Sequence, residues 1–318
     1  MEKLSTQLRK HFILMFLLLS VVILFVTTTT DDAFATEGGG NAYPNGAEDF
    51  WCGLIPPPGF YFINYFLYYH ADDFNNKHGD NVDEDFDLDV VANTFRFIKI
   101  TNHKILGANW GVHMFVPIVY QDVTPPFTGR NDTQTGVGDI IVDPLILSWH
   151  FSKNFHLAAG IDIFMPTGRY DADDLANTSR NYWTFEPIVA FTYMTDFGLE
   201  VSSKFMYDIN TNNPDTDYRS GQEFHFDYAV GYKVSDWTVG AAGYYYKQIT
   251  NDKINGEKVT FPDALGFEDG FKGQAIAVGP AVKYGCKNIS FTLKYLWDTE
   301  VEHRPEGQSL WFKLVYAF

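Results

Sequence analysis

The chain has 318 residues, and its 40 aspartate and glutamate residues against 23 lysine and arginine residues give a formal net charge of -17 at pH 7. Proteins that bind nucleic acid need a basic surface for the phosphates, so this balance argues against nucleic acid as a partner. Aromatic residues make up 17% of the chain. That share favours a sheet with an apolar outer face over a soluble sandwich.

Residues 1–35 have the order of a secretory signal peptide. Arg9 and Lys10 precede an apolar run over 12–26, and Ala33-Phe34-Ala35 follows a polar stretch. The run of about 15 apolar residues is shorter than the roughly 20 that a helix needs to span a bilayer. The pattern therefore predicts cleavage after Ala35 rather than a membrane anchor.

Residues 36–58 contain too many glycines and prolines for a strand. We expect this segment to start in the periplasm, with Phe50 and Trp51 as its anchors. Two placements stay open, since barrels occur with plugged and with open lumens. The segment either enters the barrel as a plug or caps its rim.

Residues 59–318 alternate apolar and polar side chains with a period of two, between short turns and long loops. Because no second apolar run is long enough for a spanning helix, a membrane form requires a closed barrel. The sequence thus predicts an all-β fold, an antiparallel transmembrane β-barrel of the outer membrane with about 12 strands, both ends of which lie in the periplasm. The expected strands are 59–71, 86–100, 106–121, 137–151, 155–168, 182–195, 199–209, 222–234, 237–249, 273–284, 289–299 and 308–318.

The alternation also predicts which side chains face lipid. In 222–234, Phe224 and Phe226 share one parity, while Glu223, His225 and Asp227 share the other. Lipid does not solvate charges, so the polar set should face the lumen. In 86–100 the aromatic residues change parity, which indicates either a bulge near 92–94 or a mixed lumen wall.

The chain ends on Phe318 after an alternating strand. We expect this strand to close the barrel against the first strand, with its aromatic end in the periplasmic girdle. Such an ending is also similar to the C-terminal signal that the outer-membrane insertion machinery reads.

Twelve strands leave a narrow lumen, because eight-stranded barrels are filled and sixteen-stranded porins are open. Aromatic side chains in the lumen would guide an apolar solute. Charged ones would form either a selectivity filter or an ion-pair network that holds the wall together. The lumen-lining candidates are Phe66, Tyr68, His113, Phe115, Asp139, Asp143, Asp162, Phe164, Glu186, Glu200, Lys204, Asp208, Glu223, His225, Asp227, Lys233, Lys283, Lys294, Asp298 and Lys313.

Catalysis and cofactors find little support. Glu223, His225 and Asp227 resemble acid/base groups, but no G-x-S-x-G motif supplies a nucleophile. The acidic loop 72–87 lacks EF-hand spacing, so we expect a solvated loop that at most shares divalent ions with lipopolysaccharide. No catalytic residue, cofactor or metal site is predicted.

The chain has two cysteines, Cys52 and Cys286. If Cys286 lies in a periplasmic turn, both are on one side of the membrane and could form a disulfide. Two free thiols are the alternative.

Several stretches share a family's motifs. The most specific carry Gly136, Gly138, Asp139, Pro144 and Trp149, followed by Pro166, Thr167, Gly168 and Tyr170. These stretches resemble an outer-membrane family named for the MetA pathway of phenol degradation. The resemblance implies an outer-membrane β-barrel linked to uptake of aromatic or other hydrophobic compounds, and it supplies no catalytic residues.

The leading hypothesis is a channel in the outer membrane of a Gram-negative bacterium that takes up small hydrophobic or aromatic compounds passively. Its partners would be outer-membrane lipid, lipopolysaccharide, the insertion machinery and the solute. A non-transporting structural or surface-interaction barrel is the first alternative. The second is a lipid-modifying hydrolase, which a Ser, His and Asp cluster at the lipid-facing rim would support.

Overall fold

The structure is a computed structural model that describes residues 40–126, 128–259 and 272–318. The signal peptide predicted over 1–35 lies outside the described residues. The chain divides into two units, Met1–Asp32 and Ala33–Phe318, and every strand belongs to the second. Among the described residues, no helix is long and apolar enough to cross a bilayer.

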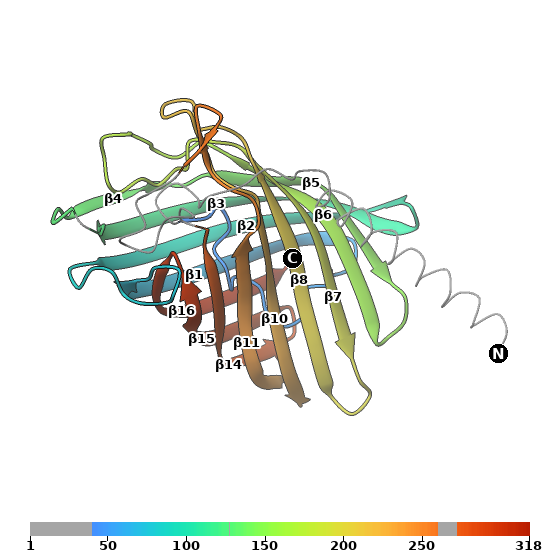
Figure 1. Ribbon diagram of the computed structural model, residues 1–318. Helices are drawn as coiled ribbons and strands as arrows, with labels where there is room; N and C mark the ends of the chain where they lie inside the picture. Colours follow the sequence, from blue (N-terminus) through green and yellow to red (C-terminus); the bar gives the residue numbers. More distant parts are fainter. Residues whose placement is uncertain (1–39, 127, 260–271) are drawn as a thin grey trace. The chain divides into compact units, whose positions relative to one another are not determined.

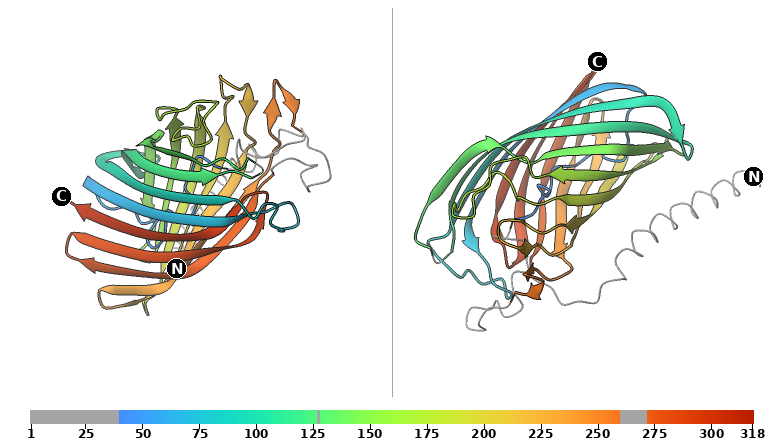
Figure 2. Two further views of the ribbon diagram at one scale, coloured as in Figure 1. Left: turned by 90° about the vertical axis from the view of Figure 1, so that its left-hand side faces the viewer. Right: turned by 90° about the horizontal axis from the view of Figure 1, so that it is seen from above.

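Thirteen strands form one antiparallel sheet, and this sheet closes because β2 pairs with both β1 and β3 (Figures 1 and 2). β4 and β5 pair with successive parts of β3 and are two segments of one wall strand, so the barrel has twelve. The sheet contains β1 (Gly59–Phe74), β2 (Asp87–Ile105), β3 (Ala108–Thr124), β4 (Asp132–Val137), β5 (Ile140–His150), β6 (Phe155–Met165), β7 (Thr184–Met194), β8 (Leu199–Asn210), β10 (Glu223–Val234), β11 (Trp237–Gln248), β14 (Gln274–Cys286), β15 (Ile289–Glu302) and β16 (Pro305–Ala317). The predicted fold class and strand number are confirmed.

Short turns connect the strands at one end of the barrel and longer loops at the other. The short strands β9 (Tyr218–Arg219), β12 (Lys253–Ile254) and β13 (Glu257–Lys258) form a small sheet within the longer loops. The turn between β2 and β3 is Leu106-Gly107, with φ of 52° and 81°. The expected strands 86–100 and 106–121 place this turn earlier, within residues 101–105. Glycine tolerates the left-handed conformation that a two-residue hairpin turn needs, which places the turn at Gly107.

The last strand closes the barrel against the first. β16 pairs with β1 from Tyr61 opposite Ala317 to Phe74 opposite Pro305. At the short-turn end the Phe318 amide donates to the Phe60 carbonyl, and the two rings lie 6.2 Å apart, edge to face. The predicted closure by an aromatic terminal strand is confirmed.

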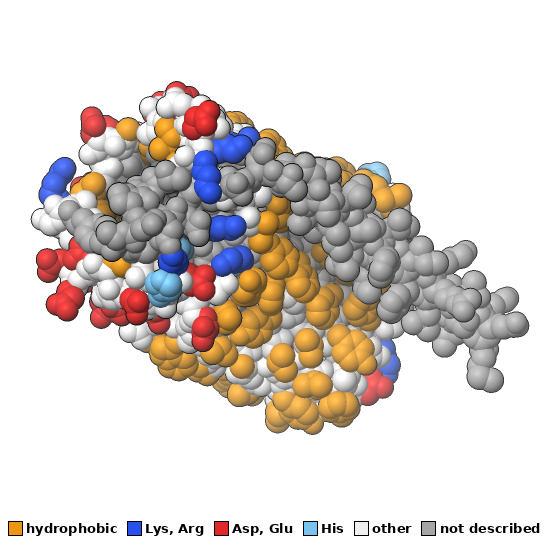
Figure 3. Space-filling view, viewed as in Figure 1, with side chains coloured by type: hydrophobic (Ala, Val, Ile, Leu, Met, Phe, Trp, Pro, Cys, Tyr) orange, Lys and Arg blue, Asp and Glu red, His pale blue; other side chains and the backbone are white. Residues whose placement is uncertain are grey.

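The two faces of the wall differ as the alternation requires. In β10, Glu223, His225 and Asp227 are buried, whereas Val230 and Tyr232 are exposed on the outside. Apolar side chains cover the wall in Figure 3, and acidic side chains gather at one end. This is the distribution of a barrel with a lipid-facing outer surface.

β2 has a mixed inner face rather than a bulge. Its register is continuous from Leu88 to Ile100 with β1 and from Asp87 to Ile100 with β3. Thr94, Arg96 and Ile98 face the lumen and line its cavities. The change of aromatic parity therefore reflects a mixed lumen wall and not a bulge near 92–94.

Candidate functional site in the barrel lumen

Residues 40–58 form no strand and run along the inside of the barrel. At the long-loop end, Arg304 donates to Asn41 Oδ1 at 2.8 Å. Toward the short turns, the Gly53 amide donates to Thr192 Oγ1 at 3.0 Å, and β1 starts at Gly59. We call residues 41–58 the lumen segment.

Asp227 on β10 anchors the first part of the lumen segment. Its carboxylate accepts hydrogen bonds from the Tyr43 hydroxyl at 2.7 Å and from the Gly46 and Glu48 amides at 2.8 Å each. Because the carboxylate is 1% exposed, the three donors replace the water that it loses. A segment without secondary structure of its own thus has its backbone donors satisfied by the wall.

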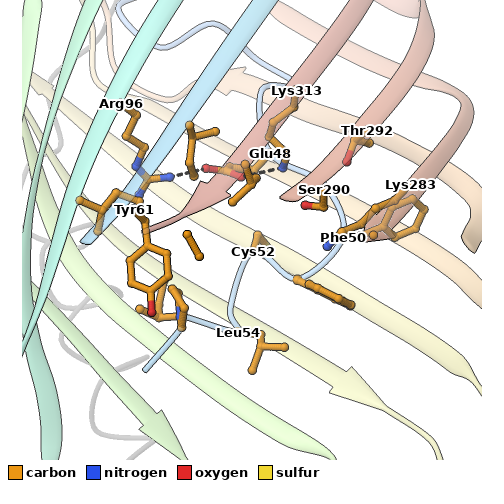
Figure 4. A pocket seen from close by; sticks show the side chains of 18 of the residues that line it. Glu48, Phe50, Cys52, Leu54, Tyr61, Arg96, Lys283, Ser290, Thr292 and Lys313 are labelled. Atoms are coloured by element: carbon orange, nitrogen blue, oxygen red, sulfur yellow. Dashed lines mark hydrogen bonds and ion pairs between the residues drawn. The ribbon is translucent and has the colours of Figure 1, made fainter. Parts of the chain in front are cut away.

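Three basic side chains of the wall hold the middle of the lumen segment. Lys294 donates to the Ala47 and Glu48 carbonyls at 3.1 and 2.9 Å. Lys313 lies 2.7 Å from Asp49 Oδ1 and 3.4 Å from Glu48 Oε2. Arg96 on the opposite wall pairs with Glu48 Oε1 at 3.0 Å, as Figure 4 shows. Glu48 therefore bridges two sides of the barrel.

The electrostatic environment keeps Glu48 ionised. Burial alone would raise the pKa of its carboxyl group, but Lys313 and Arg96 outweigh burial and hold the pKa well below its ordinary value.

Phe50 and Trp51 fill spaces that small wall residues leave. A Cβ added to Gly231 would lie 2.5 Å from Phe50 Cε1, so only glycine at this position leaves room for the ring. The Trp51 amide donates to Glu200 Oε1 at 2.7 Å, and Lys283 Nζ lies 3.0 Å from the centroid of the Trp51 ring. Both predicted anchors of the segment contact the lumen wall.

Two cavities flank the middle of the lumen segment. The larger, of about 560 Å³, opens among the short turns, and its lining includes Ile63, Ile98, Ile146 and Ile188. The smaller, of about 230 Å³, lies toward the long loops and has an aromatic lining. Glu48 and Lys204 line both cavities, so the segment separates them at this level.

The structure places most of the charged candidates on the inner face. The following are buried: His113, Asp143, Asp162, Phe164, Glu186, Glu200, Lys204, Asp208, Glu223, His225, Asp227, Lys283, Lys294, Asp298 and Lys313. Phe115 is half-buried and lines the smaller cavity. Lys233 is exposed at the mouth of the larger cavity, 6.0 Å from the Trp51 ring centroid. Many of these charges pair with each other or with the lumen segment.

Asp139 has a local role at the long-loop end. Its carboxylate accepts from the Thr167, Gly168 and Arg180 amides and so fixes one loop between strands β6 and β7.

Phe66 and Tyr68 do not line the lumen, and their assignment to it is wrong. Both are exposed on the outer face, at 37% and 41%, while Tyr65 and Leu67 line the smaller cavity. The reason is that residues 60–69 of β1 carry no charged side chain on either parity to mark the inside, and the polar Asn64 shares the parity of Phe66.

The two cysteines are free, and the bridge considered from the sequence is not formed. Cys52 Sγ lies 3.9 Å from the Phe191 carbonyl oxygen, and burial raises the pKa of its thiol. Cys286 is exposed at the end of β14.

The geometry around His225 does not support a hydrolase. In the described part of the chain its two ring nitrogens accept or donate no hydrogen bond, so no serine is activated there. Elsewhere Ser148 Oγ lies 3.4 Å from His150 Nε2, but His150 Nδ1 meets His156 instead of a carboxylate.

Sequence reasoning missed Tyr43, Glu48, Asp49 and Arg96. The first three lie in a segment without periodicity, which offers no parity to read. Arg96 carried a usable signal, because a single arginine in a spanning strand belongs on the lumenal side.

A closed antiparallel barrel of twelve strands, with an apolar outer face and a charged lumen, is the architecture of outer-membrane β-barrel channels. The model of the family described as "Putative MetA-pathway of phenol degradation" matches residues 71–314, and the chain belongs to this family. A comparison with curated proteins gave no match.

A solved outer-membrane channel has a similar fold. The COG4313 outer membrane channel from Pseudomonas putida F1 is similar with a TM-score of 0.71 and 16% identity, over 83% of this chain and 97% of that one. The TodX deltaS2S3 mutant monoaromatic hydrocarbon channel has a TM-score of 0.44 and 8% identity, over 91% of this chain and 99% of that one. A Pseudomonas aeruginosa FadL homologue has a TM-score of 0.40 and 9% identity, over 90% of this chain and 97% of that one. The last two are too distant to bear on fold or function.

Proposed function

We propose that the protein is a channel of the Gram-negative outer membrane for passive uptake of small hydrophobic or aromatic compounds. The observation that carries the proposal is the pair of cavities on either side of the lumen segment, which meet at Glu48 and Lys204. A solute would pass from the smaller to the larger cavity when the segment shifts at that level. The short-turn end, with both ends of the barrel wall, would face the periplasm.

The lining supports an aromatic solute. The smaller cavity presents Tyr65, Phe115, Phe164 and Trp311, which offer flat apolar surfaces. The larger presents isoleucines together with Arg96, Lys233, Lys283 and Lys313. Basic groups around an apolar cavity favour an aromatic compound that carries a carboxylate over one that carries an amine.

Solute flux into liposomes tests the proposal. We expect the protein to admit benzoate faster than phenol, and phenol faster than benzylamine. Ala158→Phe would fill the larger cavity, which Ala158 lines, and should slow the flux. Val239→Phe on the exposed outer face is the matched control and should leave it unchanged. Equal, protein-independent flux for all three solutes would refute the channel.

A structural barrel that transports nothing is the second candidate. The lumen segment favours it, because backbone and side chains of that segment bind both sides of the wall between the cavities. This candidate predicts no flux with or without Ala158→Phe, and unchanged growth of a deletion strain on aromatic compounds.

A further inference from the structure

Four neighbouring strands bring four carboxylates together at one level of the lumen wall. Asp162 on β6 is directly opposite Glu186 on β7, and Asp208 on β8 is directly opposite Glu223 on β10. The pairs Thr184–Asn210 and Ile188–Met206 bracket Glu186 and Asp208 on the two middle strands. Like charges opposite each other destabilise a sheet, so this row requires compensation.

Within the described residues, direct ion pairs to lysine lie on one side of the row, and Arg304 and Arg180 act on Glu223 only at longer range. Lys204 Nζ lies 3.3 Å from Asp162 Oδ2 and 3.5 Å from Glu186 Oε1. In the described part of the chain, both oxygens of Asp208 and of Glu223 make no hydrogen bond, and neither do Glu186 Oε2 and the two ring nitrogens of His225. All four side chains are 0% exposed, so bulk water does not reach them. Buried polar groups left in this state are costly, which points to a missing ligand.

The unpartnered atoms converge on one point. His225 Nε2 lies 3.3 Å from Asp208 Oδ2 and 3.6 Å from Glu186 Oε2. One donor atom from each of the three residues lies within 4.8 Å of the others. Tetrahedral Zn²⁺ with bonds of about 2.0–2.1 Å places its donor atoms about 3.3 Å apart. The spacing is that of a metal site and is too long for a direct His–Asp hydrogen bond of ordinary length.

We propose that Glu186, Asp208 and His225 bind a divalent first-row transition-metal ion, Zn²⁺ or Mn²⁺, with the Glu223 carboxylate beside it balancing charge. An imidazole among carboxylates suits these ions, whereas Ca²⁺ and Mg²⁺ select sites made of oxygen alone. The ion would join β7, β8 and β10.

A second group of similar composition makes a useful contrast. His113, Asp143 and Asp162 also lie close together. There, His113 Nε2 is 2.7 Å from Asp162 Oδ1, Arg96 contacts His113 Nδ1, and Asp143 accepts from the Leu145 and Ile161 amides. These residues satisfy one another, so they require no ion.

The proposed ion lies directly beneath the lumen segment. The Tyr43 ring packs 5.1 Å from the His225 ring, centroid to centroid, and the Tyr43 hydroxyl binds Asp227. None of the three ligand residues lines either cavity. The ion would therefore enter as the barrel folds, exchange slowly afterwards and fix the ring on which Tyr43 rests.

The test folds the full mature chain from urea into detergent with EDTA, Zn²⁺, Mn²⁺ or Ca²⁺, removes free ions by gel filtration and measures the retained metal by mass spectrometry. We expect one Zn²⁺ or Mn²⁺ ion per chain, no retained Ca²⁺, and a higher thermal midpoint than in EDTA. Asp208→Asn and His225→Gln should weaken binding at least about tenfold, since even outer-shell changes around a metal cost about 10–100-fold.

Asp298→Asn is the matched control. Asp298 is another buried lumenal carboxylate, but its oxygens already accept from Tyr244 and Tyr69, so this variant should keep the ion. Should a variant fail to fold, the visible spectrum of the Co²⁺-loaded wild type tests the site. Strong visible absorption would show Co²⁺ bound in a tetrahedral site, because hydrated Co²⁺ absorbs weakly.

The competing state is a cluster of protonated carboxyl groups that share hydrogens. It predicts no retained metal, equal midpoints in EDTA and in Zn²⁺ or Mn²⁺, and a more stable barrel after Asp208→Asn. That set of results would overturn the proposal. Metal content does not depend on transport, so the outcome is separate from that of the flux assay.

Discussion

Arg96 on β2 and Glu48 in the lumen segment form an ion pair of 3.0 Å, with about a tenth of each side chain exposed. Tyr65 donates to the same Glu48 oxygen at 3.1 Å. This contact ties a segment without secondary structure to a strand 48 residues further along the chain. It also marks the level at which the two cavities are separated.

Replacing Glu48 tests that contact. Glu48→Gln leaves Arg96 with no carboxylate partner in the described part of the chain, while Lys313 keeps Asp49. Breaking a buried ion pair by removing one partner costs about 3–5 kcal/mol, and we expect the lower end of that range. Urea unfolding in detergent measures the loss, and planar-bilayer conductance should rise as the segment loosens. Glu84→Gln, at an exposed position of the loop 75–86, should change neither quantity.

The same substitution predicts a pH dependence. The pKa of Glu48 is held well below its ordinary value in the folded protein, so its ionised form stabilises the fold. This contribution is fully present above the unfolded pKa of about 4.3 and is lost as pH falls toward the folded value. The difference in midpoint between wild type and Glu48→Gln should therefore be constant from neutral pH to about 5 and shrink below about 4. A difference that grew on acidification would contradict the assignment.

Gly231→Val should dislodge Phe50. Even one added carbon would lie 2.5 Å from the Phe50 ring, so the ring must move away from β10. We expect chymotrypsin to cleave the folded variant at Phe50 or Trp51 much faster than the wild type, as shown by mass spectrometry of the fragments. Gly285→Val on β14 is the control. An added Cβ there meets nothing closer than 4.0 Å, so the cleavage rate should not change.

Phe66→Lys tests the outer face of β1. A lysine that faces lipid near the middle of the bilayer costs about 2–4 kcal/mol in a β-barrel. The variant should unfold at correspondingly lower urea concentration in lipid vesicles. Ser290→Lys, whose side chain lines the larger cavity, should be tolerated far better. If both variants unfolded at the same urea concentration, Phe66 would face the lumen and not the lipid.

The strands of the wall could be predicted from the sequence because lipid-facing and lumen-facing side chains alternate at every second residue. Glu223, His225 and Asp227 alternate with aromatic residues, and lipid leaves one orientation for such a strand. Around Phe66 in β1 neither face carries a charged side chain, so the same rule could not decide which face points to the lumen. The sequence also identified Phe50 and Trp51 as anchors, because large aromatic side chains in a Gly- and Pro-rich segment need a place to pack.

The contents of the lumen could not be predicted in the same way. Glu186, Asp208 and His225 come from three strands, and their convergence depends on strand registers that no local pattern encodes. The contacts of Asp49 with Lys294 and of Glu48 with Lys313 join residues more than 240 positions apart in the chain. Tertiary pairing alone brings such groups together.

Lys294 and Lys313, which hold the middle of the lumen segment, belong to β15 and β16, the last two strands of the described sheet. Glu48 and Asp49 therefore lack these two counter-charges until β15 and β16 have formed, while Arg96 on β2 is available to Glu48 earlier. Until then Glu48 and Asp49 remain hydrated, and the unfinished sheet has an open seam between β1 and β16. A chain truncated before β15 would keep the contacts of the lumen segment with Arg96 and Asp227 but would lose those with both lysines.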